Sequence, residues 1–307
     1  MKRKTVLTKK LFSFLLAFTL LCSCFVSAAA AGGSELKIEY DGNTKIISNI
    51  QGAVSARSRS AQNASQSAAV WDLLREIGYT DEEIATLPED LIAEYAAAKK
   101  IYAVVDEKTV DDSSGGIQPM STIDPPRTYD SNKIRVVFTV TDAGYLNGRR
   151  AFTLNTVGSW KSTPAMTLKD IIAMAWTGNA LTAGSAQSSC SMSYTRNLWS
   201  NGQCIQSSNL TAPAKDMEEV NNFPNYAMKY DIPSPSIIPQ YTYTNIVLRA
   251  TTKVTATGDF AACGGYGHQT IVGSPNVSIT NAGDWSIGLD FNYTMDEFFA
   301  GTIRVYV

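Results

Sequence analysis

Alternating apolar and polar positions in the second half of the chain favour β-strands. Residues 134–140 and 151–157 show this pattern most clearly. Later runs rich in threonine, valine, isoleucine and tyrosine, separated by glycine, asparagine, aspartate or proline, are 246–257, 270–280, 285–293 and 302–307. Short strands at this spacing predict a mainly β fold, with an antiparallel β-sandwich (or barrel) over residues 128–307.

Two stretches of that region are less regular. Residues 166–176 fit a helix capped by Thr167, but the alternation of Ile172, Met174 and Trp176 favours a strand that begins near Asp170. Residues 213–239 contain five prolines and predict a long irregular connection at the surface.

The first part of the chain follows other patterns. An Asp41-Gly-Asn turn between two apolar runs predicts a β-hairpin over residues 35–50. Residues 51–67 have almost no large apolar side chain and predict a flexible linker. We therefore assign residues 32–68 to a hairpin and a linker.

Helical periodicity follows from residue 69 to residue 103. Gly78 is placed to end the first helix, and Thr80 with Glu83 forms a capping box for the next. Residues 69–106 are thus expected to form a small acidic helical segment, which could be a prosegment. Residues 107–127, rich in aspartate, serine, glycine and proline, predict a linker before the β-domain.

The N-terminus has the plan of a secretory signal peptide over residues 1–31. Five basic residues and no acid accompany an apolar run, and four alanines then give small residues for cleavage after Ala31. Two alternatives are open: a lipid anchor on Cys24, or an uncleaved membrane anchor, because the apolar run approaches the length that spans a bilayer. Secretion to the extracellular space is the favoured prediction.

Removal of the signal changes the charge balance. The mature chain keeps 21 basic and 28 acidic residues, and the excess of acid lies wholly within residues 32–127. No basic footprint remains for nucleic acid, so a nucleic-acid partner is not expected.

Three cysteines remain after cleavage, namely Cys190, Cys204 and Cys263. In an oxidising compartment one pair is expected to be bridged, and Cys190 with Cys204 is the pair closest in sequence. The main rival is that all three are reduced.

His268 is the only histidine and follows Cys263 closely. The two could form a thiol nucleophile and its base, or join the other two cysteines in a Cys₃His zinc site. The favoured interpretation is simpler: a glycine-rich turn between two strands with a partly buried imidazole. Neither a metal nor a cofactor is expected.

Aromatic residues are the other candidates for binding. Trp199, Tyr194 and Tyr266 could form a platform for a sugar or a protein, and Trp199 is expected to be exposed because it precedes a Ser-Asn-Gly turn. A pair of acids for glycoside hydrolysis could come from four residues: Asp284, Asp290, Asp296 and Glu297.

The lysine-rich signal, the segment 78–91 and the Tyr266-Gly-His-Gln turn resemble those of uncharacterised secreted proteins of Gram-positive bacteria. The resemblance implies export from such a cell and no particular activity, so it assigns no catalytic residue.

Three functions are therefore compared. The favoured one is a non-catalytic extracellular β-domain that binds an envelope component, a glycan or a protein. The first alternative is a secreted hydrolase. The second is a toxin or membrane-active protein, held inactive by the acidic helices, with residues 182–194 as the inserting hairpin.

Overall fold

The computed structural model describes residues 35–54, 64–109, 133–164, 168–184, 187–221, 223–269, 275–283, 286–292 and 295–307. The predicted signal peptide, with Ala31 and Cys24, lies outside these residues. Within them, no helix has both the length and the apolar character needed to cross a bilayer.

The strands are β1 Lys37–Asp41, β2 Thr44–Ser48, β3 Lys100–Thr109, β4 Lys133–Leu146, β5 Arg149–Ser162, β6 Lys169–Trp176, β7 Ala180–Thr182, β8 Ser188–Ser200, β9 Gln203–Thr211, β10 Met217–Glu219, β11 Tyr226–Asp231, β12 Ser236–Ile237, β13 Gln240–Ala256, β14 Phe260–Gln269, β15 Val277–Gly283, β16 Ser286–Phe291 and β17 Met295–Val305. The helices are α3 Ala64–Ile77, α4 Asp81–Ile84, α5 Glu89–Ala97 and the 3₁₀ helix η2 Ala214–Asp216. Residues 50–54 add a short helical turn.

The strands form antiparallel sheets, as predicted. A ten-stranded sheet has the order β1-β2-β3-β4-β5-β13-β8-β9, with β7 and β12 also paired to β13. A five-stranded sheet has the order β10-β11-β6-β14-β17, and β15 pairs with β16. Both large sheets are open, with two end strands each, so the predicted sandwich is the arrangement observed.

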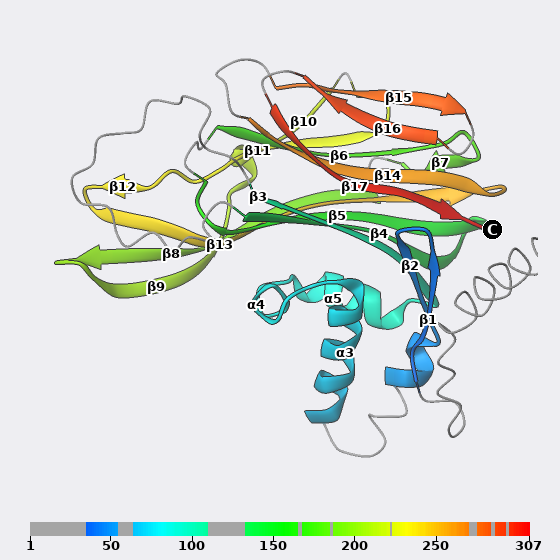
Figure 1. The fold of residues 1–307 in the computed structure, drawn as a ribbon, viewed down its shortest axis with the longest axis horizontal. Helices are drawn as coiled ribbons and strands as arrows, with labels where there is room; N and C mark the ends of the chain where they lie inside the picture. The colour runs from blue at the N-terminus through cyan, green and yellow to red at the C-terminus, as the bar shows by residue number, and fades with distance from the viewer. Residues whose placement is uncertain are drawn as a thin grey trace, which may run out of the picture. The chain divides into compact units, whose positions relative to one another are not determined.

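Three apolar cores hold four layers together (Figure 1). The largest core lies between the two large sheets and contains side chains of β3, β4, β5 and β13 on one side and of β6, β11, β14 and β17 on the other. The helices pack on the outer face of the ten-stranded sheet. The β15–β16 hairpin covers the outer face of the five-stranded sheet. The central strands are therefore buried on both faces.

The acidic helices meet basic side chains of the sheet that they cover. Arg249 of β13 is 5% exposed, and its guanidinium lies 2.7 Å from a carboxylate oxygen of Asp90 and 3.8 Å from one of Glu94. Arg135 of β4 lies 3.6 Å from Glu83. Burial raises the pKa of Glu94, and the nearby Arg249 offsets part of that rise. Acidic residues of the helical segment thus form ion pairs with arginines of the ten-stranded sheet.

Helices form within residues 69–106 as predicted, but the helical segment begins earlier and ends earlier than predicted. The capping box of Thr80 and Glu83 is present, and Gly78 ends α3 with φ +119°. However, α3 begins at Ala64, inside the predicted linker, and α5 ends at Ala97. Residues 100–109 form β3, because their side chains up to Val104 are buried within the sheet instead of along one helical stripe.

The predicted domain limit at 107–127 stays a prediction. Strand β3 runs across its first residues and pairs with β4 from Ile101 opposite Thr141 to Thr109 opposite Lys133. The hairpin predicted over residues 35–50 is confirmed as β1–β2. Segment 166–176 ends in a strand, β6, as predicted.

Two predictions about irregular segments are wrong. Residues 213–239 contain β10, β11 and β12, and β11 is an inner strand of the five-stranded sheet beside β6. The supposed turn around His268 is part of β14, a ten-residue strand in which every residue is buried. Its glycines lie between packed layers and do not turn the chain.

Candidate functional site

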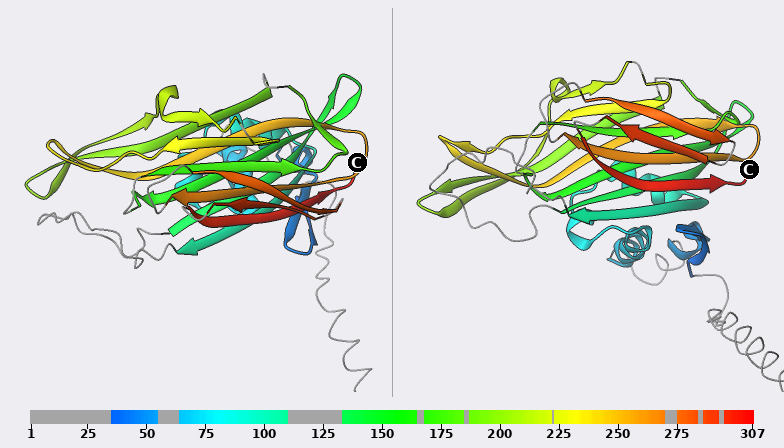
Figure 2. Two further views of the ribbon diagram at one scale, coloured as in Figure 1. Left: turned by 90° about the horizontal axis from the view of Figure 1, so that it is seen from above. Right: turned by 45° about the horizontal axis from the view of Figure 1, so that its top comes forward.

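Four strands continue beyond the body of the sandwich as a ribbon (Figures 1 and 2). Strand β13 pairs with β5 only up to Thr244 opposite Ser162. Before that point it pairs with β8 on one side and β12 on the other, and β9 completes the set. A bulge at Asn245, whose φ is +50°, separates the ribbon from the body. Such bulges bend a strand and redirect it.

One face of this ribbon carries a ladder of neutral hydroxyl and amide groups. We call it the polar face; its members are Thr195, Asn197, Trp199, Ser207, Asn209, Thr242 and Thr244. They share a face because residues two apart on a strand point the same way, and because the cross-strand pairs Thr195–Asn209, Asn197–Ser207, Thr242–Asn197 and Thr244–Thr195 lie opposite each other.

Hydrogen bonds between neighbouring strands order the polar face. The indole Nε1 of Trp199 donates to Thr242 Oγ1 at 2.8 Å. The amide of Asn197 donates to Thr244 at 3.2 Å and accepts from Ser207 at 2.6 Å. Trp199 is half-buried, so part of its ring remains at the surface. Trp199 is therefore less exposed than the sequence analysis expects, and its role in binding stays a prediction.

The opposite face of the ribbon is aromatic. Tyr194 and Tyr243 meet edge to face with ring centroids 5.3 Å apart, and the guanidinium of Arg196 lies 4.8 Å from the ring centroid of Tyr241. Tyr194 and Tyr243 also pack against the main core. Tyr194 and Trp199 therefore lie on opposite faces and cannot form the single platform expected from the sequence.

Charge is almost absent from the ribbon. Residues 188–211 and 236–246 contain one charged side chain, Arg196. At the ends of the strands, by contrast, large aliphatic side chains are exposed: Ile205 is 60%, Ile237 74% and Ile238 91% exposed. We call these three residues the ribbon tip.

Tyr266, the third predicted binding residue, lies in the interior. It is 0% exposed and belongs to a polar cluster between the two large sheets. Its hydroxyl donates to Asp170 and accepts from Trp160 Nε1 at 2.6 Å, and the other oxygen of Asp170 lies 2.8 Å from His268 Nδ1. Tyr266 therefore cannot bind an external ligand directly, and its predicted role is wrong.

Asp170 was not recognised as a member of this cluster from the sequence. It lies opposite His268 in the β6–β14 register, 98 positions apart in the chain, so only strand pairing brings the two together. Burial raises the pKa of Asp170, and the neighbouring His268 offsets part of the rise. Asp170, Trp160, Tyr266 and His268 are at most 1% exposed, so the cluster is shielded from solvent.

The proposed thiol and base do not meet. Cys263 and His268 are both on β14, but they are five positions apart and therefore point to opposite faces. Cys263 packs in the outer core against β15–β16, whereas His268 faces Trp160 between the sheets. Burial also raises the pKa of Cys263 to about 12, which disfavours the thiolate.

The structure contradicts the predicted Cys190–Cys204 bridge, since Cys190, Cys204 and Cys263 are all free thiols. Cys204 lies opposite Trp199, nine positions along β8 from Cys190. At about 3.3 Å per strand residue, this separation is about 30 Å, far beyond the reach of a disulfide. Proximity in sequence was misleading because both cysteines lie in extended strands.

The zinc alternative fails for the same geometric reason. The three cysteines and His268 lie on β8, β9 and both faces of β14. Among the described residues, no group of three or more histidine, cysteine, aspartate or glutamate side chains is placed to hold a metal ion.

The acids considered for glycoside hydrolysis are described only in part. Asp290 and Glu297 are exposed at the surface, and one oxygen of Glu297 accepts the backbone N–H of Phe291 at 3.1 Å. Asp284 and the side chain of Asp296 lie outside the described residues.

Comparison with known proteins does not assign a family. No protein-family model and no curated protein matches this sequence. Among solved structures, the pilus backbone RrgB of Streptococcus pneumoniae is 8% identical, covering 67% of this chain and 79% of that chain with a TM-score of 0.26. The membrane-inserted NetB toxin of Clostridium perfringens is 9% identical, covering 66% and 95% with a TM-score of 0.23. Both TM-scores are too low to support an argument about this chain.

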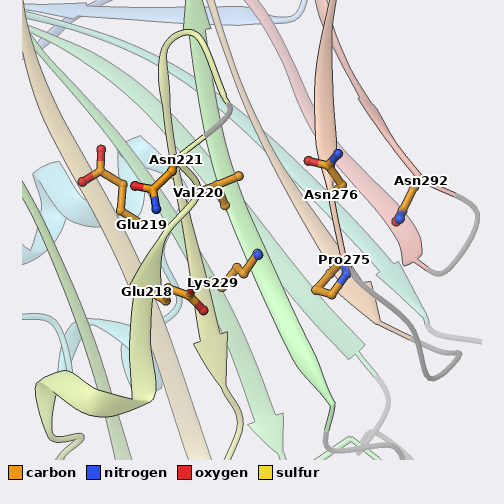
Figure 3. A pocket seen from close by; sticks show the side chains of 8 residues that line it. All are labelled: Glu218, Glu219, Val220, Asn221, Lys229, Pro275, Asn276 and Asn292. Carbon is orange, nitrogen blue, oxygen red and sulfur yellow. The ribbon is translucent and has the colours of Figure 1, made fainter.

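A pocket of about 360 Å³ lies away from the ribbon, beside β10 and β11 (Figure 3). Its lining residues are Glu218, Glu219, Val220, Asn221, Lys229, Pro275, Asn276 and Asn292. The Asn276 amide oxygen already accepts the backbone N–H of Val277 at 2.9 Å. Ligand pockets are usually lined mainly by apolar and aromatic groups. With two apolar lining residues and no aromatic one, this pocket is a weaker candidate than the polar face.

Most members of the polar face were missed in the sequence. The signal available was the recurrence of serine, threonine or asparagine at every second position from Ser189 to Asn197. That pattern has the period of a strand, but its members are polar, so an apolar periodicity does not detect it.

Proposed function

We propose that this protein is exported and acts without catalysis, binding a neutral glycan of the cell envelope through the polar face of the ribbon. The observation that carries the proposal is the combination of Trp199 with an ordered, uncharged set of hydroxyl and amide groups. A sugar presents hydroxyl groups at its rim and C–H groups on its ring faces. The polar ladder matches the former, and an aromatic ring with its apolar surface matches the latter.

The order of the polar groups supports this proposal energetically. Thr195 donates to Asn209 at 2.8 Å, and the other contacts hold Asn197 and Trp199 in place. Groups that are already oriented lose less conformational entropy when a ligand binds. The absence of charge on this face favours a neutral polymer over a polyanion such as nucleic acid.

We expect Trp199→Ala to weaken binding to the preferred glycan by about tenfold or more, because tryptophan is a typical centre of binding energy. The measurement is retention on insoluble cell-wall polysaccharides, followed by titration calorimetry with a soluble fragment of the retained polymer. Tyr145→Ala is the matched control: this residue is 72% exposed and lies near the end of β4, outside the ribbon. Equal binding by wild type and Trp199→Ala would contradict the role of the polar face.

The ribbon tip favours a second candidate function, contact with a membrane surface. Ile237 and Ile238 follow one another at the β12–β13 turn and are largely exposed. Aliphatic side chains in this state gain free energy on entering a lipid interface. The segment 182–194 does not form the hairpin expected for this role among the described residues, because β7 and β8 both pair with β13 and not with each other.

If the ribbon tip binds lipid, the wild type will sediment with phosphatidylcholine vesicles and a variant carrying Ile237→Ser and Ile238→Ser will not. Leu181→Ser is the control, since Leu181 is another exposed aliphatic residue, 51% exposed on β7 outside the ribbon. Wild-type protein that stays in the supernatant would exclude this function, and the glycan test is independent of the result.

A further inference from the structure

The open edges of the two large sheets differ in how they are protected. Edge strands can pair with other chains unless charge, proline, shortness, a bulge or a covering element prevents it. Strand β1 carries Lys37, Glu39 and Asp41, and its lysine and glutamate form an ion pair at 2.6 Å. Strand β10 has three residues, two of them glutamates.

Strand β17, the other edge of the five-stranded sheet, is protected by a register shift and by its packing against β3. Its register with β14 shifts at Gly264–Gly265, and Gly301 of β17 lies against Val104 of β3, where an added Cβ would be 3.1 Å from Cγ1. A partner strand cannot approach an edge that already packs against another sheet.

Among the described residues, strand β9 has only one of these devices, a register shift opposite Leu198 and Trp199 at one end. Residues Gln203–Thr211 contain no charge, no proline and no glycine, and seven of the nine are exposed. Among the described residues its only strand neighbour is β8. The register shift between β8 and β9 lies at the Trp199 end and leaves a regular run from Gln206 to Thr211. A regular neutral edge of this length can accept another strand.

We propose that β9 pairs with β9 of a second copy of this chain, antiparallel about a twofold axis. With Ser207 on the axis, Gln206 of each copy faces Ser208 of the other, within the regular run of β9. A twofold contact uses the same patch on both subunits and closes on itself, which limits the assembly to two copies. Neither β9 carries charge, so two copies meet without repulsion.

The pairing would extend the polar face. A twofold axis between antiparallel strands of one sheet is perpendicular to the sheet, so the same face of both copies points to the same side. The polar ladders of two ribbons, including Ser207 and Asn209 of each, then form one continuous surface. This consequence rests on the proposed function, whereas the pairing itself does not. Two linked sites would raise the apparent affinity for a polymer without any new contact.

The test uses the full mature chain and Gln206→Lys. Gln206 is exposed on β9 and is not part of the polar face. A lysine there places two like charges near the axis, on the same face of adjacent strands, where they repel. The control Ser200→Lys adds the same charge to the same hairpin, but on β8 at the turn, away from the pairing edge.

We expect sedimentation velocity over a range of concentrations to show a dimer for wild type and Ser200→Lys, with a dissociation constant raised at least tenfold in Gln206→Lys. Amide hydrogens of β9 should exchange more slowly in the dimer than in Gln206→Lys. A wild type that is monomeric throughout, or a dimer unaffected by Gln206→Lys, would overturn the proposal. A dimer that retains no glycan would instead refute the proposed function and leave the pairing intact.

Discussion

We expect Asp170→Ala to lower the free energy of unfolding by about 3 kcal/mol, because it leaves buried polar groups without their hydrogen-bond partner. The side chain of Asp170 is 0% exposed and contacts both His268 and the hydroxyl of Tyr266. Alanine removes a carboxylate from between two sheets and leaves polar groups facing a small void. Urea unfolding followed by tryptophan fluorescence measures the loss, with Trp160 in the cluster as a native probe.

Asp170→Asn is the matched control for this prediction. Its amide has nearly the same shape as the carboxylate and keeps an oxygen that can accept the Tyr266 hydroxyl, so it should lose clearly less stability than alanine. If both variants had the same midpoint of urea unfolding as the wild type, the cluster would not contribute to holding the two sheets together.

The same variant gives the sign of a pH effect. Burial raises the pKa of Asp170 in the folded state above its value in the unfolded chain, which is about 3.9. Between these two values the folded protein keeps a proton that the unfolded chain has lost. Stability is therefore greatest below the unfolded pKa and falls as the pH rises through the folded pKa. Asp170→Asn has no group to titrate, so its stability should lack this component of the pH dependence.

The pattern of the sequence was most informative for strands with clear apolar alternation. Residues 134–140 and 151–157 lie in β4 and β5 as expected. It failed for β14, which is buried on both faces and so has no polar side to alternate with. The ribbon strands β8 and β9 failed for the opposite reason, because much of their alternation is among polar residues.

Contacts between residues far apart in the chain could not be predicted from the sequence either. The Asp170–His268 pair depends on the β6–β14 register, and no local pattern around either residue specifies that register. Trp199, in contrast, could be selected locally because it stands beside an Asn-Gly turn, where Asn201 adopts a positive φ of 52°. The sequence thus found a residue of the candidate site but not the surface to which it belongs.

The glycines of β14 explain why this strand was taken for a turn, and they lead to the second prediction. Gly264 faces the ring of Phe138 across the main core. A Cβ added to Gly264 would press on that ring and lie 2.6 Å from Thr156 Oγ1. Gly158 similarly faces Tyr266, where a Cβ would lie 2.8 Å from Cδ2 of the ring. Glycine is required at these positions because the two sheets approach closely there.

We therefore expect Gly264→Ala to lower the free energy of unfolding by up to about 3 kcal/mol, because neither Phe138 nor Thr156 has room to move within a packed core. Gly258→Ala is the control: its nearest neighbour, the Asn179 amide, would be 3.9 Å from the new Cβ, so its stability should change by at most about 0.5 kcal/mol. Thermal unfolding of both variants beside wild type decides the matter. If Gly264→Ala and Gly258→Ala have the same melting temperature, the close approach of the two sheets does not explain why residue 264 is glycine.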